Sequence, residues 1–358
     1  MALGDLKRYA FINAKLRSRI ANMFDDKSVE LLINSTSLEE LFQQLKGTAY
    51  EPLIKLYDES GDIERLESWL FARSISLYKE VAALMEGSHS DVVVALTRKQ
   101  EVENLKGVIR LWFSNKIKGQ NIDYRFGYLY QKPIVSTIDW ELIINAKTFK
   151  EIVDELEKSP YKEAFEELDT EKLSSDGLFF LETALDRIWI KLLRQSVAKM
   201  TKADRLLVES VLDRDADLKN IINLVRFGYL YNLDVDNLRK LMLKGGKVTS
   251  TEEFEKYLAT EKDKRSIESL VERHFPDLAK IVTTEPKGSP EAQTLKVEHY
   301  LFKVRRNSYS KMLRGYPFSF GTILAYFFLE ERQNNLIRTV INGINYQLNE
   351  KQIREAVL

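Results

Sequence analysis

Three glutamates, Glu67, Glu182 and Glu298, recur in a pattern that could support chemistry. Each follows an apolar residue and precedes a leucine by three positions, near the start of a long helical stretch. Carboxylates gathered in one cavity would raise one another's pKa values and could serve acid–base catalysis. Alternatively, each glutamate stabilises the positively polarised end of its own helix. Both interpretations require the chain to position the same helix three times.

A second polar set, Asn104, Asp217 and Asn335, falls in one register of another recurring segment. Each is followed by a leucine and by apolar residues at three- and four-residue steps, which places the apolar side chains on one helix face. The polar side chains could contact a partner, or they could bond to nearby backbone groups. We therefore treat them as candidate interface residues.

Other reactive patterns are missing from the sequence. The chain has no cysteine and only three histidines, at scattered positions, so neither a thiolate nucleophile nor a spaced metal site is expected. The Gly-Lys segment Lys244–Lys247 lacks the spacing of a phosphate-binding loop and is expected to form a turn. We expect no catalytic residues, no cofactor and no metal.

Basic residues form a cluster near aromatic side chains, at Lys303, Arg305, Arg306, Lys311 and Arg314. The cluster could meet anionic lipid headgroups or an acidic partner, or it could be a solvated helix face balanced by nearby glutamates. Because 54 basic residues balance 54 acidic ones, the chain has no overall positive field that would favour nucleic acid.

The composition is that of a folded globular protein, with 44% hydrophobic and 30% charged residues in 358. The longest apolar run, residues 323–329, is much shorter than the about 20 residues of a membrane span. The N-terminal segment, MALGDLKRYAFINAKLRSR, lacks the apolar core of a signal peptide. We expect a cytoplasmic protein, or one peripheral to a membrane.

Helical patterns dominate the chain. Residues 7–24 have an amphipathic pattern, and a helix is predicted over 330–343 with Gly343 as its stop. Three short segments each begin with a hydroxyl residue suited to cap a helix, at Ser37, Thr148 and Thr251. Proline and glycine predict a loop over 283–294.

These recurring elements follow one another in the same order three times, at intervals of about a third of the chain. Tyr50 and Tyr161 add a further match, since each follows its short capped segment by the same distance. The pattern predicts an all-α protein of three similar helical lobes, arranged around an axis or in a row. We place the lobes at residues 1–120, 121–244 and 245–358.

The last third resembles the C subunit of archaeal and bacterial V/A-type ATPases, whose eukaryotic counterpart is the d subunit of the V-ATPase. The matching residues there are Phe320-Gly321-x-x-Leu324-x-Tyr326, Glu331, Asn335-Leu336 and Arg338. Earlier segments also resemble the family, at Tyr9, Ala14 and Arg17 and at Leu218-Lys219-Asn220-Ile221. Each motif is ordinary for a helix, but their order over the whole chain is specific.

The resemblance implies an all-helical funnel of three lobes around a pseudo-threefold axis. It implies a non-catalytic rotor subunit that connects the central shaft, made of the D and F subunits, to the membrane ring of proteolipid subunits. Torque would pass through it between ATP chemistry and H⁺ or Na⁺ translocation. A helical scaffold of an unrelated assembly is the alternative. The candidate shaft and ring contacts are Glu67, Asn104, Glu182, Asp217, Glu298, Arg305, Arg306, Asn335 and Arg338.

Overall fold

The protein forms helices and no strand within the described residues, which confirms the predicted all-α class. The computed structural model describes residues 3–122, 127–166, 173, 177–230, 233–261, 264–282 and 290–357. The chain divides into two compact units. Unit 1 comprises Met1–Ser174 together with Leu313–Leu358, and unit 2 comprises Ser175–Met312.

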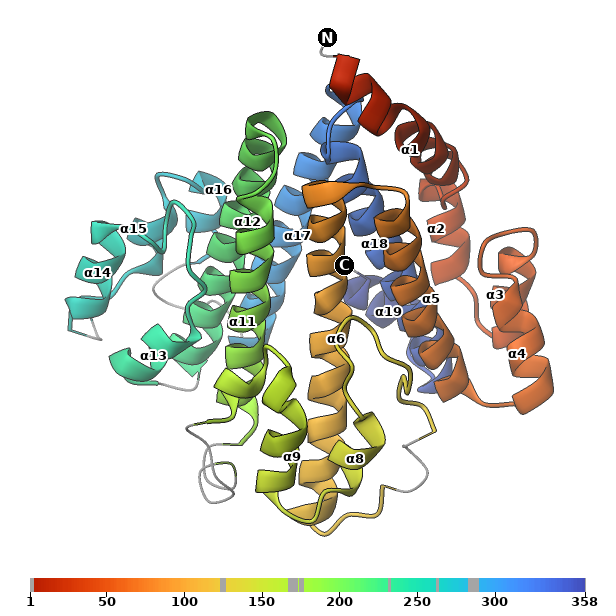
Figure 1. Cartoon of the computed structure of the whole chain (residues 1–358), viewed down its shortest axis with the longest axis horizontal. Helices are drawn as coiled ribbons and strands as arrows, with labels where there is room; N and C mark the ends of the chain where they lie inside the picture. Colours follow the sequence, from red (N-terminus) through yellow and green to blue (C-terminus); the bar gives the residue numbers. More distant parts are fainter. Residues whose placement is uncertain are drawn as a thin grey trace. The chain divides into compact units, whose positions relative to one another are not determined.

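Unit 1 contains three long helices of the first part of the chain, the short helices between and after them, and the last two helices (Figure 1). These are α1 (Leu3–Ala21), α2 (Asp26–Ile33), α3 (Leu38–Leu45), α4 (Pro52–Ser60), α5 (Ile63–Ala83), α6 (Gly87–Lys116), α8 (Trp140–Asn145), α9 (Phe149–Glu155), η1 (Leu156–Lys158), η2 (Lys162–Ala164), α18 (Gly321–Asn345) and α19 (Glu350–Ala356).

Within its described residues, unit 2 contains two long helices, then four short helices, then a further long helix whose last two residues belong to unit 1. These are α11 (Phe179–Val197), α12 (Lys202–Asn223) with its π-helical continuation Leu224–Leu230, α13 (Val235–Leu241), α14 (Glu252–Ala259), α15 (Ile267–Val271), α16 (Pro276–Ala279) and α17 (Pro290–Arg314).

One sequence of helix types occurs three times along the chain. A short helix that begins at an aspartate cap (α2, α8, α13) is followed by one that begins at a hydroxyl cap (α3, α9, α14). The predicted caps are confirmed, because Ser37, Thr148 and Thr251 each accept a hydrogen bond from the backbone N–H three residues on. Long helices follow each of these pairs.

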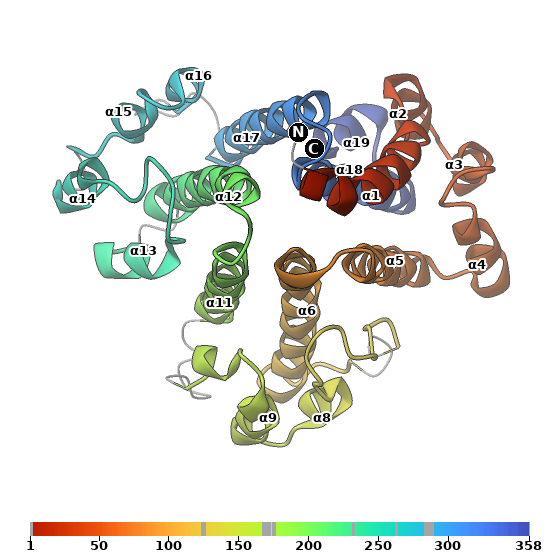
Figure 2. The ribbon, with the colours of Figure 1, turned by 45° about the horizontal axis from the view of Figure 1, so that its top comes forward.

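The core of unit 1 joins the two ends of the sequence. α18 packs against α1, α2, α3 and α5, and Figure 2 shows α18 and α1 side by side, as does Figure 1. The predicted apolar face of α18 is buried to at least 96% at Leu336, Ile337, Val340 and Ile341. These side chains pack with leucines of α2, α3 and α5 in one cluster, so α18 closes the core that the first helices begin.

The predicted end of this helix at Gly343 is wrong. α18 starts at Gly321 and continues to Asn345. A Cβ on Gly343 would lie 2.5 Å from the Ile353 side chain of α19, so this glycine allows two helices to approach closely. The left-handed residue that ends α18 is Gln347, with φ 55°; its N–H bonds to Ile344 and the next N–H bonds to Gly343, a Schellman motif.

The loop predicted over 283–294 also needs correction. Residues 283–289 lie outside the described part, but Pro290 already begins α17. Proline suits the first position of a helix, because its fixed φ is helical and the N–H it lacks would have no intrahelical partner. The proline in this segment therefore starts the helix that it was expected to prevent.

Unit 2 has a separate hydrophobic core between α12, α17 and the short helices. Leu218 and Ile221 of α12 and Val297 and Leu301 of α17 belong to it, together with apolar residues of α13 to α16. Figure 2 shows α13 beside α12 within this unit, and the contacts between the two helices agree. The repeated short helices thus bury their apolar face against long helices.

Candidate functional site

Two adjoining clefts in unit 1 are lined by residues of α5, α6 and α18. The first has a volume of about 440 Å³ and the second about 410 Å³. They share the side chains of Phe71, Glu103 and Arg338. Predicted interface residues line both: Glu67, Asn104 and Arg338 the first, Asn335 and Arg338 the second. The structure thus brings four of the nine candidates together along one surface.

α18 contributes a polar stripe to these clefts. Asn335, Arg338, Asn342 and Asn345 follow one another at three- and four-residue steps, which aligns them on one helix face. The Asn342 amide donates a hydrogen bond of 2.7 Å to Glu67 of α5, so this pair joins the two helices at the floor of the first cleft. Amide groups both donate and accept, which suits contact with polar groups of another chain.

Arg338 lies where the two clefts meet. Its side chain is half-buried, its Nε atom is buried without a hydrogen bond, and it has no ion pair in the described part of the chain. Two acids on the cleft walls have basic partners, Glu331 with Lys99 at 2.5 Å and Glu103 with Lys106 at 2.9 Å, and Glu67 accepts from the Asn342 amide. The guanidinium is therefore available to an anion from outside the unit.

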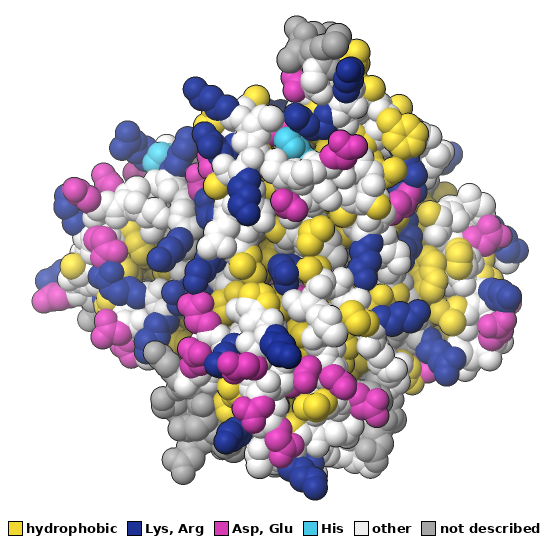
Figure 3. Space-filling view, in the orientation of Figure 1, with side chains coloured by type: hydrophobic (Ala, Val, Ile, Leu, Met, Phe, Trp, Pro, Cys, Tyr) yellow, Lys and Arg dark blue, Asp and Glu magenta, His cyan; other side chains and the backbone are white. Residues whose placement is uncertain are grey.

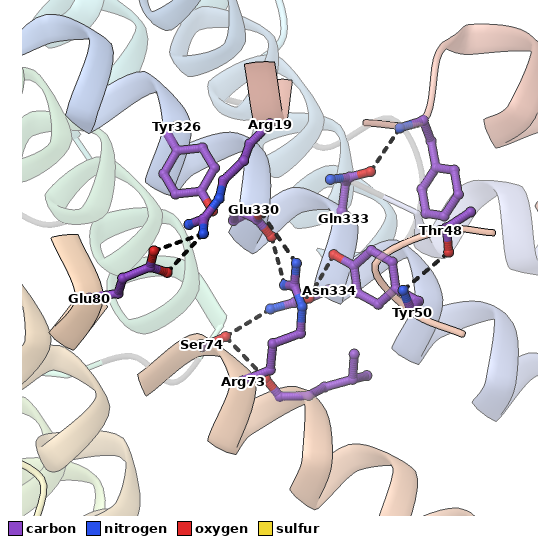
Figure 4. A network of polar contacts seen from close by, with 12 residues as sticks. Arg19, Thr48, Tyr50, Arg73, Ser74, Glu80, Tyr326, Glu330, Gln333 and Asn334 are labelled. Carbon is purple, nitrogen blue, oxygen red and sulfur yellow. Dashed lines mark hydrogen bonds and ion pairs between the residues drawn. The ribbon is translucent and has the colours of Figure 1, made fainter. Parts of the chain in front are cut away.

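A buried polar network forms the wall behind the second cleft (Figure 4). Arg73 of α5 donates to both carboxylate oxygens of Glu330 on α18, at 2.7 and 3.4 Å. The Tyr50 hydroxyl donates to Asn334 Oδ1 at 2.9 Å, and the Asn334 amide donates to Ser74 Oγ at 2.7 Å. These contacts fix the rotation of α18 and hence the direction of its polar stripe.

Burial sets the ionisation states of this network. Desolvation raises the pKa of Tyr50 and of Tyr326 far above the ordinary tyrosine value, and the charge of Glu330 raises both further. Burial acts to lower the pKa of Arg73, but its hydrogen bond to Glu330 and the charge interactions with Tyr50, Glu330 and Tyr326 together leave the pKa raised. The tyrosines stay neutral and the arginine stays charged, so the contacts of this network hold α5 and α18 together.

α1 is fastened to the same region through Glu80 of α5. Arg19 Nη2 donates to both Glu80 oxygens at 2.9 Å, and Lys15 Nζ lies 2.6 Å from Oε1 (Figure 4 shows the arginine). Burial acts to raise the pKa of Glu80, but the hydrogen bonds from Lys15 and Arg19 lower it on balance. Charge pairs thus link α1, α5 and α18.

Asn104 and Asp217 hold the chain segments that return after their helices. The Asn104 amide donates to the Tyr130 carbonyl at 3.0 Å. Asp217, 2% exposed, accepts from the backbone N–H groups of Lys247, Val248 and Thr249 at 2.6 to 3.1 Å. Both lie within their helices and bond to backbone groups, as the alternative interpretation expected, but the bonded groups are 26 to 32 residues away in the sequence. Asn335, their counterpart in the repeat, is exposed.

Sequence reasoning missed Glu101, which is fully buried in α6. It accepts from the Val135 and Ser136 N–H groups at 2.6 and 2.5 Å and from the Tyr161 hydroxyl at 2.7 Å. The recurrence of Tyr50 and Tyr161 was the available signal, since both hydroxyls bond to a polar residue of a long helix. It did not show which residue.

The remaining candidates lie in unit 2. Glu298 accepts from Arg226 at 2.7 Å, Arg305 forms an ion pair with Asp215 at 3.3 Å, and Arg306 is exposed on α17. Glu182 lies in the first turn of α11, where the helix dipole favours an acid. Of the three recurring glutamates, Glu67 lines the first of the two clefts along α5, α6 and α18, and neither of these clefts contains Glu182 or Glu298. Among the described residues, no group of three acids or histidines could hold a metal.

Charge is interspersed over the visible surface. On the face in Figure 3, Lys and Arg side chains alternate with Asp and Glu, with hydrophobic patches between them. No helix in the described ranges has both the length and the apolar character needed to cross a bilayer.

The family model and the individual relatives that match this chain agree on one protein family. The family model described as ATP synthase (C/AC39) subunit matches residues 12–356. A protein of Methanocaldococcus jannaschii, named as the C subunit of an A-type ATP synthase, is 27% identical over 256 residues, which are 71% of this chain and 58% of that relative's length. Proteins with the same name from Pyrococcus horikoshii (22% identical, 98% and 90% covered) and Methanococcoides burtonii (21%, 99% and 95%) align along nearly the whole chain. This chain therefore belongs to the ATP synthase (C/AC39) subunit family.

Proposed function

We propose that this chain is a non-catalytic central-stalk component of a V/A-type ATPase or ATP synthase. It would connect a shaft of D and F subunits to the membrane proteolipid ring and transmit torque to H⁺ or Na⁺ translocation. Its three helical lobes would surround a pseudo-threefold axis as a funnel, peripheral to the membrane. The observation that carries this proposal is the family match over residues 12–356, where the relatives are named as C subunits of A-type ATP synthases.

The internal fastening of unit 1 suits transmission of torque. Close-packed helices compress little, so a force applied to one of them is passed to its neighbours. The buried Arg73–Glu330 pair joins α5 to α18, and the pair of Arg19 with Glu80 joins α1 to α5. A twisting force on α18 would thus be shared by three long helices.

The clefts along α5, α6 and α18 supply a docking surface. Their walls carry amides, carboxylates and one guanidinium over an aromatic floor at Phe71, a mixture typical of contact with a soluble helix. Glu67, Asn335 and Arg338 are retained as shaft contacts on this ground. Arg306, exposed on α17, is retained as a contact of the shaft or ring.

The two alternative functions, an enzyme and a scaffold of an unrelated assembly, lead to different expectations. An enzyme using the recurring glutamates would need two or more of them in one cleft. A scaffold of an unrelated assembly would bind neither shaft nor ring. Binding experiments therefore separate the proposal from the scaffold.

The test combines binding with coupling. Purified full-length chain should bind a D–F shaft and, separately, a detergent-solubilised proteolipid ring. Membranes that lack the chain should hydrolyse ATP without moving ions, and adding it back should restore coupled transport. Normal coupled transport in its absence would overturn the proposed role.

A further inference from the structure

Arg338 is a half-buried cation with no internal partner, and this state is costly unless something else satisfies it. Its Nε atom is shielded from water, yet it forms no hydrogen bond or ion pair within the described ranges. A buried donor left unbonded loses its hydration without compensation. Arg73 of α5 shows the contrast, since both carboxylate oxygens of Glu330 accept hydrogen bonds from it.

The chemistry of the guanidinium selects its ligand. Its planar fork of N–H donors matches a carboxylate, and a bidentate pair of this kind is stronger and more directional than a lysine contact. Three acids around it form ion pairs with other residues: Glu331 with Lys99, Glu103 with Lys106 and Glu330 with Arg73. Glu67, in the first cleft, accepts a hydrogen bond from the Asn342 amide. Because none of these acids pairs with Arg338, its guanidinium is open to a carboxylate from another chain.

The surroundings of Arg338 resemble the centre of a protein interface. Phe71 of α5 packs edge-on against Tyr130 at 6.2 Å and forms an apolar floor that both clefts share. Tyr346, 71% exposed, lines the far part of the first cleft, and the exposed amide of Asn335 lines the second. Arginine and tyrosine are enriched among the residues that carry most of the binding energy.

The shape of the polar stripe favours a helix end as the occupant. The last turn of a helix leaves backbone C=O groups without intrahelical partners, and amide side chains such as Asn335 can donate to them. An apolar side chain of the same turn would contact Phe71, while a carboxylate beside it would reach Arg338. The walls suit a soluble, polar helix end better than the apolar surface of a membrane ring.

We propose that the groove at Arg338 binds the helical end of the central shaft by pairing the Arg338 guanidinium with a carboxylate of that helix. This inference rests on the proposed function, because it takes the shaft as the partner. It adds the chemical group that is recognised and the residue that recognises it.

The experiment measures the affinity of full-length chain for the purified D–F shaft in three variants. Arg338→Gln removes the charge and should weaken binding about tenfold to a hundredfold, the usual effect of losing a charge-assisted hydrogen bond. Arg338→Lys keeps the charge without the fork and should fall between. The matched control is Arg354→Gln on α19, which removes an exposed arginine paired with Glu30 and Glu350 and should leave affinity unchanged.

A stability readout separates a binding role from a structural one. Because Arg338 has no internal partner, Arg338→Gln should keep the melting temperature of the free chain at or above the wild-type value. A lower melting temperature with unchanged shaft affinity would show a structural arginine and overturn the proposal.

The source of the carboxylate is found from the partner's side. Acidic residues in the terminal helix turns of the shaft are changed to the amide one at a time, and the terminal carboxylate is removed by truncation. The correct group weakens binding to the wild-type chain but not to Arg338→Gln. Absence of any such coupling would overturn the carboxylate assignment.

The following outcomes separate the inference about Arg338 from the proposed central-stalk function. If the wild-type chain binds the shaft and Arg338→Gln binds equally well, the groove assignment fails while the proposed function stands. If Arg338→Gln loses affinity for the solubilised ring instead, the shaft assignment is wrong. If the wild-type chain binds neither partner, both proposals fail.

Discussion

Glu330 and Asp217 are two buried carboxylates on long helices, one in each unit, and they are satisfied in opposite ways. Glu330 faces a full positive charge, Arg73, which comes from a helix far away in sequence. Asp217 accepts hydrogen bonds from backbone N–H groups and the Thr249 hydroxyl, all in the segment 247–249 that follows α13. The first carboxylate joins two helices through a charge pair, whereas the second holds a turn against its helix through neutral donors.

The two carboxylates therefore differ in how they relate to the proposed binding surface. The Arg73–Glu330 pair lies behind a cleft wall, and Glu330 and Asn334 are among the residues that line that cleft. A change there would alter both the stability of unit 1 and the direction of Asn335 and Arg338. Asp217 is enclosed by its turn, so a change there should affect the stability of unit 2 alone.

The largest effect is expected from breaking the Arg73–Glu330 pair on one side. Arg73→Met leaves a carboxylate that is 9% exposed without its charge partner, which should cost about 3–5 kcal/mol of unfolding free energy. Adding Glu330→Leu should recover much of that loss, because two apolar side chains need no charge compensation. Urea denaturation of the single and double variants measures both values.

Lys55→Met is the matched control for this prediction. Lys55 pairs with Glu59 at 3.7 Å, but both side chains are exposed, so its loss should cost less than about 0.5 kcal/mol. If Arg73→Met proved as mild as Lys55→Met, the buried pair would not be a fastening and the comparison with Asp217 would lose its basis.

Asp217 should show a smaller loss, since its donors are neutral. Asp217→Asn replaces one acceptor oxygen by an NH₂ group that meets backbone N–H donors, at a cost of about 1–3 kcal/mol. Gly246→Ala should act on the same turn, because at φ +98° its Cβ would clash with Asp217 Oδ1. Gly119→Ala, with φ +66° and open space, isolates the backbone strain.

Urea denaturation of Asp217→Asn, Gly246→Ala and Gly119→Ala measures how tightly the turn at 246–249 packs around Asp217. Gly246→Ala should be more destabilising than Gly119→Ala, by the amount that the clash adds to the strain. Equal losses for the two glycine variants would mean that the turn adjusts freely around Asp217.

Local features of the fold could be predicted from the sequence. The caps at Ser37, Thr148 and Thr251 depend on neighbours three residues away, and the buried face of α18 depends on helical periodicity. Gly343 was misinterpreted because its role depends on Ile353, which approaches only after the chain has reversed direction. Spacing within one helix contains no such information.

The candidate site shows the same limit. Recurrence identified Asn104 and Asp217 as special, but which atoms they bond is decided by loops at Tyr130 and at 247–249. The Arg73–Glu330 pair joins positions that no repeat relates. Arg338 was found through the family resemblance, whereas its lack of a partner is visible only in the folded chain.

Removing a helix cap should destabilise each unit by a similar amount, and by less than the changes at Arg73 or Asp217. Ser37→Ala on α3 and Thr251→Ala on α14 each remove one acceptor for a backbone N–H at a helix start, which typically costs about 1 kcal/mol. Similar losses, measured by urea denaturation, would show that the units differ in their buried acids and not in their repeated caps. A loss at only one cap would break the equivalence of the repeat.

The smallest effect concerns pH and the ion pairs that hold α1. The pKa of Glu80 is lowered below its ordinary value of 4.5, because the hydrogen bonds from Lys15 and Arg19 outweigh burial. Its stabilisation is therefore complete above that ordinary value and is lost as the pH falls through the folded-state pKa. A third of the side chain is exposed, so the contribution should be less than about 1 kcal/mol. Glu80→Gln should be less stable than wild type at pH 7, and the two unfolding free energies should converge at low pH. A gap that is constant with pH would assign the loss to packing of the α1–α5 contact, leaving Arg73–Glu330 as the charge pair on which unit 1 depends.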